Sequence, residues 1–347
     1  MSRTNVTNSV KLLAKNGELI NSGFTKKPVM PFNKEVISKK NRIKEWDNYV
    51  IQDDRFFVDL TILNMSYLAE IRISVIDLHH GFVYKKTSRL FNPQNSVLMA
   101  SDFRKGVSDC KTKDAWVRFE NHAGQRILKG YFKNFYKSKT YTGDLEFEFK
   151  IHKEPDESIV SANNFKDKKH FIYSQKINDL EADGSIIVNG KMYTFDKDLT
   201  FSNCLIARGV MPYSSRWEIS TVNARDKDGN MVAFNLGRIL GKGDKVEENI
   251  VFYDGKIEKI SDIKVYNNKN GFKQNAMNTW TFYSDDGKLE LFFEPVLSVK
   301  QGVNWFVVRN KTNLILGSYT GKITLDNGKE IEIEKVMGFS ETVKNKW

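Results

Sequence analysis

Short runs of β-branched and aromatic residues, in which apolar and polar positions alternate, dominate the chain from Trp46 onward. In the segment 144–152 the apolar positions are Leu145, Phe147, Phe149 and Ile151. Such alternation gives a strand one buried and one solvent-facing side, as in antiparallel sheets. Residues 56–63 and 68–76 have the same texture and are predicted to form two strands joined near Asn64. Because helical periodicity is scarce, the pattern predicts an all-β fold.

One strand-turn-strand pattern occurs twice. Residues 184–195 and 321–333 each contain a strand, a tight turn with Asn and Gly, and a second strand, with one inserted residue in the second copy. Asn and Gly suit this turn because hairpin turns that match the twist of strands need positive φ. A glycine and an aromatic segment follow each copy and end in Trp217 and Trp347. The repetition predicts a duplicated β domain.

A chain of 347 residues exceeds the size at which one hydrophobic core usually keeps growing, so two domains are expected. The repeat places the boundary near residue 200. We therefore expect a basic N-terminal arm over 1–40, a first β domain over 41–200 and a second over 201–347. Many short antiparallel strands with Gly-rich turns fit a barrel or a sandwich. A barrel leaves no exposed strand edge and encloses an interior that can hold one apolar ligand.

The net charge of +11 is concentrated at the start of the chain. Residues 1–45 hold ten Lys and Arg against three Glu, a net charge of +7, which leaves +4 for the remainder. A folded nucleic-acid module concentrates basic residues on one face, often beside stacking aromatic residues. The arm is poor in aromatic residues, so the distribution argues against nucleic-acid binding. It is more typical of a solvated leader that lies over a domain, and weak contact with an anionic membrane surface stays open.

Cysteine and histidine positions give no sign of a metal site or a cofactor. Cys110 and Cys204 stand far apart, and the chain has no His-x-His or His-Glu-x-x-His pattern. It also lacks the Gly-rich phosphate loops of nucleotide-binding proteins and the Gly-x-Ser-x-Gly motif of serine hydrolases. The start of the chain lacks the apolar stretch of a signal peptide, and no window approaches the length of a membrane span. We therefore expect a cytoplasmic protein with reduced thiols, no metal and no cofactor.

The segment 206–218 is the densest collection of Arg, Tyr, Trp and Glu in the chain, placed around a Gly and a Pro. One interpretation is a turn whose large side chains plug the end of a barrel. The functional interpretation makes Arg208 a clamp for an anion or a carbonyl group, Tyr213 a proton donor and Trp217 an apolar or cation-stabilising wall. Binding pockets commonly combine an apolar lining with a few such polar groups.

A second candidate segment contains Asn235, then the adjacent pair Glu247 and Glu248, followed by Asn249. Adjacent residues on a strand point to opposite faces, so at most one of the two carboxyl groups would face an interior. A carboxyl group turned into an apolar barrel keeps its proton near neutral pH and can act as a general acid. Two solvated turn carboxylates are the alternative interpretation.

Several motifs follow one another after residue 40, namely Glu45-Trp46-Asp47, Arg208-Gly209-Val210-Met211-Pro212-Tyr213, Trp217, Asn235-Leu236-Gly237, Glu248-Asn249, Asp254-Gly255 and Gly338-Phe339-Ser340-Glu341. In order and spacing the series resembles the bacterial domain-of-unknown-function family 2804 (DUF2804). That family is similar to the lipocalin-like proteins that include carotenoid 1,2-hydratase, the AttH proteins and tocopherol cyclase. The resemblance covers nearly all of the chain beyond the arm.

The resemblance implies two lipocalin-like (calycin-type) antiparallel β domains, in agreement with the repeat, and hydrophobic, often isoprenoid ligands. For some members it also implies chemistry in which a carboxylic acid protonates an alkene and aromatic faces stabilise the carbocation. The chain departs from the family pattern at the acidic position, here Leu205, and at one tryptophan, here Met211. The site residues that the resemblance supports are Arg208, Tyr213, Trp217, Asn235, Glu248 and Asn249.

Three functions are therefore open. The first is binding of a hydrophobic small molecule in a β-barrel pocket without chemistry, which Leu205 in place of the acid favours. The second is a hydratase, cyclase or isomerase without a metal, with Glu248 as the acid and Tyr213 as its partner. In both, the ligand-binding residues are Arg208, Trp217, Asn235 and Asn249. The third is a structural or interaction protein whose barrels are filled by side chains.

Overall fold

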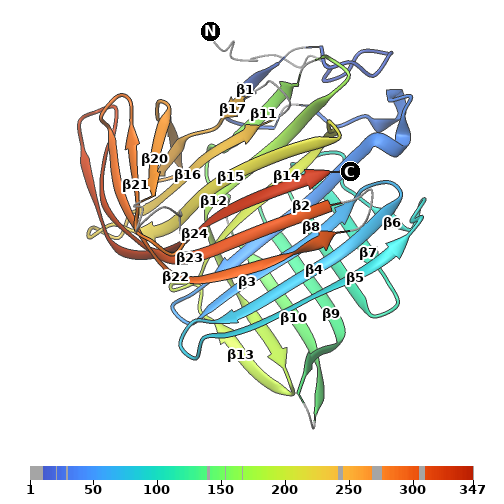
Figure 1. Ribbon diagram of the computed structural model, residues 1–347, viewed down its shortest axis with the longest axis horizontal. Helices are drawn as coiled ribbons and strands as arrows, with labels where there is room; N and C mark the ends of the chain where they lie inside the picture. Colours follow the sequence, from blue (N-terminus) through green and yellow to red (C-terminus); the bar gives the residue numbers. More distant parts are fainter. Residues whose placement is uncertain are drawn as a thin grey trace. The chain divides into compact units, whose positions relative to one another are not determined.

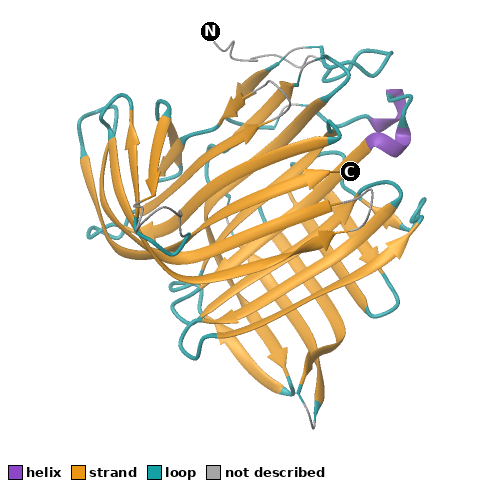
Figure 2. Ribbon diagram, in the orientation of Figure 1, coloured by secondary structure: helices purple, strands orange, loops and turns teal. Residues whose placement is uncertain are grey.

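The computed structural model describes residues 11–20, 22–28, 30–138, 141–152, 154–165, 167–240, 245–267, 276–304 and 309–346 (Figure 1). Their regular structure is strand, apart from two short 3-10 helices, η1 (Lys34–Val36) and η2 (Lys40–Arg42) (Figure 2). The chain divides into two compact units, Met1–Met211 and Pro212–Trp347. The all-β fold expected from the alternating pattern is confirmed.

The described part of the first unit forms one antiparallel sheet of fourteen strands. They are β1 (Gly23–Thr25), β2 (Ile43–Gln52), β3 (Phe56–Asn64), β4 (Leu68–Asp77), β5 (Phe82–Phe91), β6 (Val97–Leu98), β7 (Lys105–Lys111), β8 (Ala115–His122), β9 (Arg126–Lys137), β10 (Thr142–Ile151), β11 (Ile159–Asn164), β12 (Phe171–Val188), β13 (Lys191–Phe195) and β14 (Phe201–Val210). The main path runs β5-β4-β3-β2-β14-β12-β10-β9-β8-β7-β6. Most neighbours in the path are also neighbours along the chain, whereas β2 and β14 come from opposite ends of the unit.

The pairing of β14 determines where the first unit ends. This strand pairs with β2 from Ile43 opposite Val210 to Gln52 opposite Phe201. The expected boundary at residue 200 would assign β14 to the second domain, but its two partners, β2 and β12, both belong to the first unit. The division therefore falls between Met211 and Pro212.

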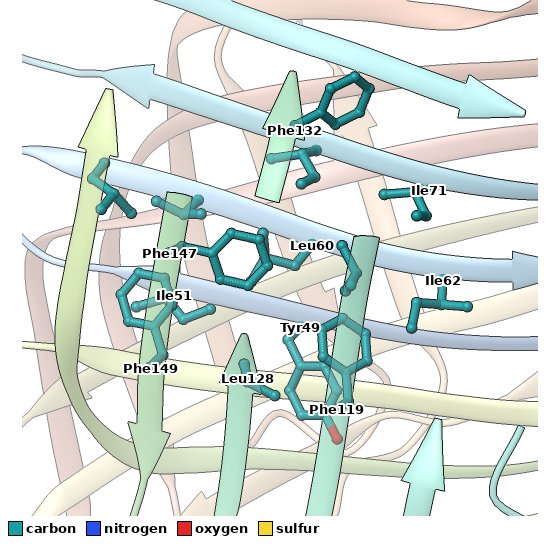
Figure 3. Close-up of a cluster of buried hydrophobic side chains, with 14 of the residues drawn as sticks. Tyr49, Ile51, Leu60, Ile62, Ile71, Phe119, Leu128, Phe132, Phe147 and Phe149 are labelled. Carbon is teal, nitrogen blue, oxygen red and sulfur yellow. The ribbon is translucent and has the colours of Figure 1, made fainter. Parts of the chain in front are cut away.

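Two arms of this sheet face each other across an apolar core (Figure 3). Tyr49 and Leu60, from β2 and β3, lie in one buried cluster with Phe119 and Phe147, from β8 and β10. In β10 the buried apolar side chains are Leu145, Phe147, Phe149 and Ile151, and the residues between them are exposed. The alternation in the sequence thus places the residues of the core.

The described part of the N-terminal arm packs on the first unit. Residues of β11, β12 and β14 share a buried cluster with the arm side chains Leu12, Leu13, Leu19, Phe32 and Ile37. Removing five apolar side chains from water holds this segment against the sheet. Lys26 of the arm stays half exposed and forms an ion pair with Glu157. The apolar residues of the arm therefore anchor it, while its charge stays at the surface.

The described part of the second unit forms a ten-stranded antiparallel sheet. Its strands are β15 (Ser214–Arg225), β16 (Met231–Leu240), β17 (Lys245–Glu247), β18 (Ile250–Tyr253), β19 (Lys256–Lys259), β20 (Ile263–Asn267), β21 (Trp280–Ser284), β22 (Leu289–Asn304), β23 (Arg309–Thr324) and β24 (Glu330–Lys346). The path runs β19-β18-β16-β15-β24-β23-β22-β21-β20, and the long strands β22, β23 and β24 lie side by side (Figure 1). The first strand, β15, pairs with the last one, β24, just as the first long strand of the first unit, β2, pairs with β14.

Two glycines mark equivalent bends in the two units. Gly184 in β12 has a φ of 148°, and Gly321 in β23 has a φ of 146°. An added Cβ atom would lie 2.2 Å from the backbone oxygen of Glu148 at the first position and 2.2 Å from that of Glu290 at the second. Both the φ value and the close carbonyl group require glycine. These glycines begin the two copies of the sequence repeat, whose final Trp347 lies outside the described residues.

We expect Gly184→Ala and Gly321→Ala each to lower the free energy of unfolding by at least about 2 kcal/mol, because the new methyl group meets a carbonyl oxygen. Gly190→Ala is the control. Its φ of 73° is also positive, but nothing lies within 4 Å of an added Cβ, so it should cost about 1 kcal/mol. Urea denaturation followed by circular dichroism measures the three losses. Equal losses would show that the carbonyl contacts do not constrain the bends.

Candidate functional site

Arg208, one of the residues expected to bind a ligand, lies inside the first unit. Its side chain on β14 is fully buried. The guanidinium group donates to the Asp47 carboxylate at 2.6 Å, and to the backbone oxygens of Ala100 at 2.9 Å and Trp46 at 3.0 Å. Charge-assisted bonds of this kind are the strong ones in proteins. Arg208 therefore clamps carbonyl groups of its own chain and joins β14 to β2 and to the segment before β7.

More buried polar side chains fill the surrounding interior. The second carboxylate oxygen of Asp47 accepts a hydrogen bond from the Ser108 hydroxyl. Arg126 donates to the Tyr49 hydroxyl at 2.9 Å and to Glu154 at 2.7 Å. The space left among these side chains is about 10 Å³, close to what a single water molecule needs. The described residues around this network therefore leave no room for a ligand among them.

The second unit contains a cavity of about 380 Å³ on one face of its sheet. Its apolar lining comes from Leu236, Ile263, Trp280, Phe282 and Ile315. These residues belong to β16, β20, β21 and β23, so the cavity lies between the two arms of the curled sheet. Further along β16 and β23, and on the neighbouring β22, an aromatic cluster of Phe234, Tyr319 and Phe293 is buried.

Three hydroxyl groups are connected at the floor of this cavity. Ser220 of β15 and Ser340 of β24 are direct cross-strand partners, and their Oγ atoms lie 2.6 Å apart. The Oη of Tyr319 lies 2.9 Å from the Oγ of Ser340. Burial raises the pKa of Tyr319 above its usual range, so the phenol stays protonated. Because Ser220 and Ser340 line the cavity, they can bind a hydroxyl or carbonyl group of a ligand.

The opposite end of the cavity is polar. Arg216 and Glu218 form an ion pair on β15, and both line the cavity. Thr342 of β24 lies opposite Glu218 on one side and opposite Asn313 of β23 on the other. All four side chains belong to the lining. The cavity therefore runs from an apolar wall to a charged end, which is the mixture expected of a small-molecule site.

Asn249 is the one of the six expected site residues that lines this cavity. Its side-chain oxygen accepts from the backbone N–H of Gly237 at 3.1 Å, and its Nδ2 donates to the backbone oxygen of Ser261 at 3.1 Å. These bonds join β16 to the segment before β20 and so hold the two arms of the sheet in place. Glu248, the adjacent residue, is buried but does not belong to the lining.

The other expected residues of the second unit lie elsewhere. Tyr213 is 52% exposed and lines a separate groove. Trp217 stands on β15 between two cavity-lining residues, so its side chain points to the opposite face of the sheet. Asn235 of β16 is buried and pairs with Thr221 of β15. Thr221 lies four residues after Trp217 on the same strand, so both point to the face opposite the cavity. The structure therefore brings Asn249 to the cavity wall and buries Glu248 beside it, outside the lining. Tyr213, Trp217 and Asn235 do not line the cavity, and Arg208 belongs to the first unit.

Arg216, Glu218 and Ser220 are functional candidates that the sequence reasoning missed. The alternation of apolar and polar residues along β15 predicts that Trp217 faces the interior and that Arg216, Glu218 and Ser220 face solvent. The structure has the polar set facing the cavity, and the same face becomes apolar only at Val222. The sequence does contain one sign of this arrangement. The three polar residues and Val222 are spaced two apart, so they share one face of the strand, and Val222 belongs to the core.

Other kinds of site have little support in the part of the chain that the structure describes. There, no group of three or more His, Cys, Asp and Glu side chains could hold a metal ion. No helix among the described residues is both long and apolar enough to cross a membrane. Cys110 and Cys204 are buried free thiols.

A curled antiparallel sheet in which the first long strand pairs with the last defines each unit as a lipocalin-like β domain. A crystal structure of CghA with Sch210972 is similar, with 8% identity, a TM-score of 0.54 and 88% of each chain covered. Kievitone hydratase from Nectria haematococca has 10% identity and a TM-score of 0.48, with 86% of this chain and 88% of that chain covered. An AttH-like protein from Nitrosomonas europaea has 12% identity and a TM-score of 0.49, with 87% and 92% covered. At such identities the likeness to CghA shows a common fold.

The chain belongs to the family described as Domain of unknown function (DUF2804), which matches residues 3–347. This confirms the resemblance that the motif series indicated. No curated protein matches the chain in sequence.

We expect Arg208→Met to lower the free energy of unfolding by about 3–5 kcal/mol, because it leaves the Asp47 carboxylate buried without its ionic partner. Arg104→Met is the matched control in the same unit. It removes an ion pair with Asp102, but Arg104 is 52% exposed, so the loss should stay below about 1 kcal/mol. Guanidinium denaturation compares the two variants. A small loss in both would contradict the structural role of Arg208.

Burial raises the pKa of Cys110 and Cys204 to about 12, from a model-compound value of 9.0. The folded protein then holds about a thousandfold less thiolate near neutral pH. Both thiols should react with a thiol-specific disulfide reagent only after unfolding. Unfolded thiols lose their protons near pH 9 and folded ones near pH 12, so their contribution to stability falls as the pH rises through this interval. Rapid labelling of the native protein would contradict the assignment.

Proposed function

We propose that the second unit binds a hydrophobic small molecule, of lipid or isoprenoid type, whose apolar body occupies the cavity of about 380 Å³. The supporting observation is the lining itself, in which Trp280, Phe282 and Ile315 form an apolar wall beside the hydroxyl groups of Ser220 and Ser340. Ligand pockets typically have about this volume and this combination of surfaces. The hydroxyl groups would orient the ligand, and the apolar wall would supply most of the affinity.

The contrast with the first unit supports the same proposal. There the ion pair of Asp47 and Arg208 is buried, and the pocket among the described residues beside it measures about 10 Å³. The third function considered, a barrel filled by side chains, therefore fits the described interior of the first unit. In the second unit the residues that line the cavity leave space that a folded core would normally close, since protein interiors are packed like organic crystals.

Acid-initiated chemistry on an alkene is the second candidate function. The observation that favours it is the position of Glu248, which is buried directly before the cavity-lining Asn249. Binding without chemistry has the stronger support, because neither Glu248 nor its proposed partner Tyr213 belongs to the lining of the cavity. We also propose a cytoplasmic location, where the free thiols of Cys110 and Cys204 would stay reduced.

The neutral fluorophore N-phenyl-1-naphthylamine tests the proposal, because its emission increases when it leaves water for an apolar site. We expect it to bind the wild-type chain and to bind Ala276→Trp at least about tenfold more weakly, since Ala276 lines the cavity and a larger side chain fills it. Val296→Trp is the control, because Val296 is 60% exposed and lies outside the lining.

Equal affinity of the probe for Ala276→Trp and Val296→Trp would exclude the cavity as its site. Failure to bind any of the three proteins would overturn the proposed function. Native mass spectrometry of freshly purified protein provides an independent measurement, because a carrier should retain an apolar passenger and Ala276→Trp should lose it.

A further inference from the structure

Cationic side chains form two adjacent rows on the sheet of the second unit, next to the polar end of the cavity. In the first row Arg216 of β15, Lys344 of β24 and Lys311 of β23 are direct cross-strand neighbours. In the second row Lys346 of β24 lies opposite Arg309 of β23. All five side chains line one groove of about 840 Å³. The rows therefore form a single basic surface, which we call the cationic groove.

This arrangement works against the stability of the sheet. Like charges directly opposite each other on neighbouring strands are destabilising, whereas opposite charges would stabilise the same pairs. The described residues that line the cationic groove include no Asp or Glu. The nearest acid on β15, Glu218, is the ion-pair partner of Arg216 and lines the cavity. Such a concentration of one charge is expected where an anion completes the site.

Arg216 connects the cationic groove with the cavity, because it lines both. Its Nη2 donates to Glu218, while its Nε is buried and has no hydrogen-bond partner among the described residues. A buried donor of a charged group that lacks an acceptor costs free energy. An oxygen atom of a ligand placed at this junction would supply the acceptor.

We infer that the ligand of the second unit is amphipathic and carries an oxyanion head, such as a carboxylate, sulfonate or phosphate, which the cationic groove binds. The inference rests on the proposed function, because it assigns the apolar body to the adjoining cavity. Arg216 provides fixed, planar donors at the junction, and Lys311 and Lys344 provide mobile point charges around the head. The groove thus selects the charge of the ligand and the cavity selects its apolar body.

Two fluorophores that share a ring system separate these two contributions. N-phenyl-1-naphthylamine is neutral, and 1-anilinonaphthalene-8-sulfonate adds a sulfonate to the same rings. We expect the sulfonate to bind the wild-type chain at least about tenfold more tightly than the neutral probe, with a preference that falls as salt is added. Lys311→Gln combined with Lys344→Gln should abolish most of the preference and leave the neutral probe unaffected.

Lys322→Gln combined with Lys335→Gln is the matched control. It makes the same change in net charge on β23 and β24, but neither residue lines the cationic groove. Thermal melting gives a second measurement. Inorganic phosphate should raise the melting temperature of the wild type and of the control but not of the groove variant, and the groove variant should be at least as stable as the wild type without an anion.

The outcomes are distinguishable. If the neutral probe binds but the sulfonate gains nothing, the inference is wrong and the proposed function stands. If neither probe binds while phosphate stabilises the wild type, the groove is a site for a free oxyanion, and both the amphipathic ligand and the proposed function are overturned. If the groove variant and the control lose the same sulfonate affinity, the preference reflects the net charge of the protein and not the groove, and the inference is wrong.

Discussion

Each unit depends on the pairing of its first long strand with its last. In the first unit β2 and β14 provide this pair, and in the second β15 and β24 do so. Without it the strands would form two separate ribbons with additional unpaired edges, which proteins generally avoid. With it the sheet curls and acquires an inner face. Because side chains alternate along a strand, the register of the closing pair decides which residues that face presents.

The two units share this strand pairing but carry different side chains on the paired strands. The closing pair of the first unit carries Asp47 and Arg208, whose charges are satisfied internally. The closing pair of the second unit carries Ser220 and Ser340, whose hydroxyl groups line a cavity. A buried ion pair contributes little net stability but is costly to break, so it favours one fixed arrangement. Hydroxyl groups at a cavity wall can exchange partners with a ligand. Within the described residues, the duplicated architecture thus combines a packed network in one unit with a cavity in the other.

The fold could be predicted from the sequence because its determinants are local. Alternation over 144–152 identified a real strand with a real buried face, and the repeat begins at the two bend glycines, Gly184 and Gly321. The site was harder to predict because its determinants are distant. The residues around Arg208 in the sequence are typical of a ligand clamp. Only the fold reveals that its partner is Asp47, which is 161 residues away.

The cationic rows show the same limitation. Each of Arg216, Lys311 and Lys344 is an ordinary surface cation in its own segment, and their alignment depends on the register of three strands. On β15, alternation would assign the apolar Trp217 to the interior, but its side chain lies on the face opposite the cavity. Asn249 was selected because the motif series resembles the DUF2804 family. In the structure it bonds to two backbone groups beside the cavity.

The closing pairs also have a consequence for the way the chain folds. Ile43 cannot meet Val210, nor Ser214 meet Lys346, until almost the entire unit has been synthesised. Contacts between residues so far apart in sequence form slowly, because a long loop must first be closed. During that interval β2, and later β15, each present an unpaired edge to other nascent chains, the condition under which β proteins aggregate. The pairing that joins the two parts of each sheet is therefore completed only when the last strand of the unit is available.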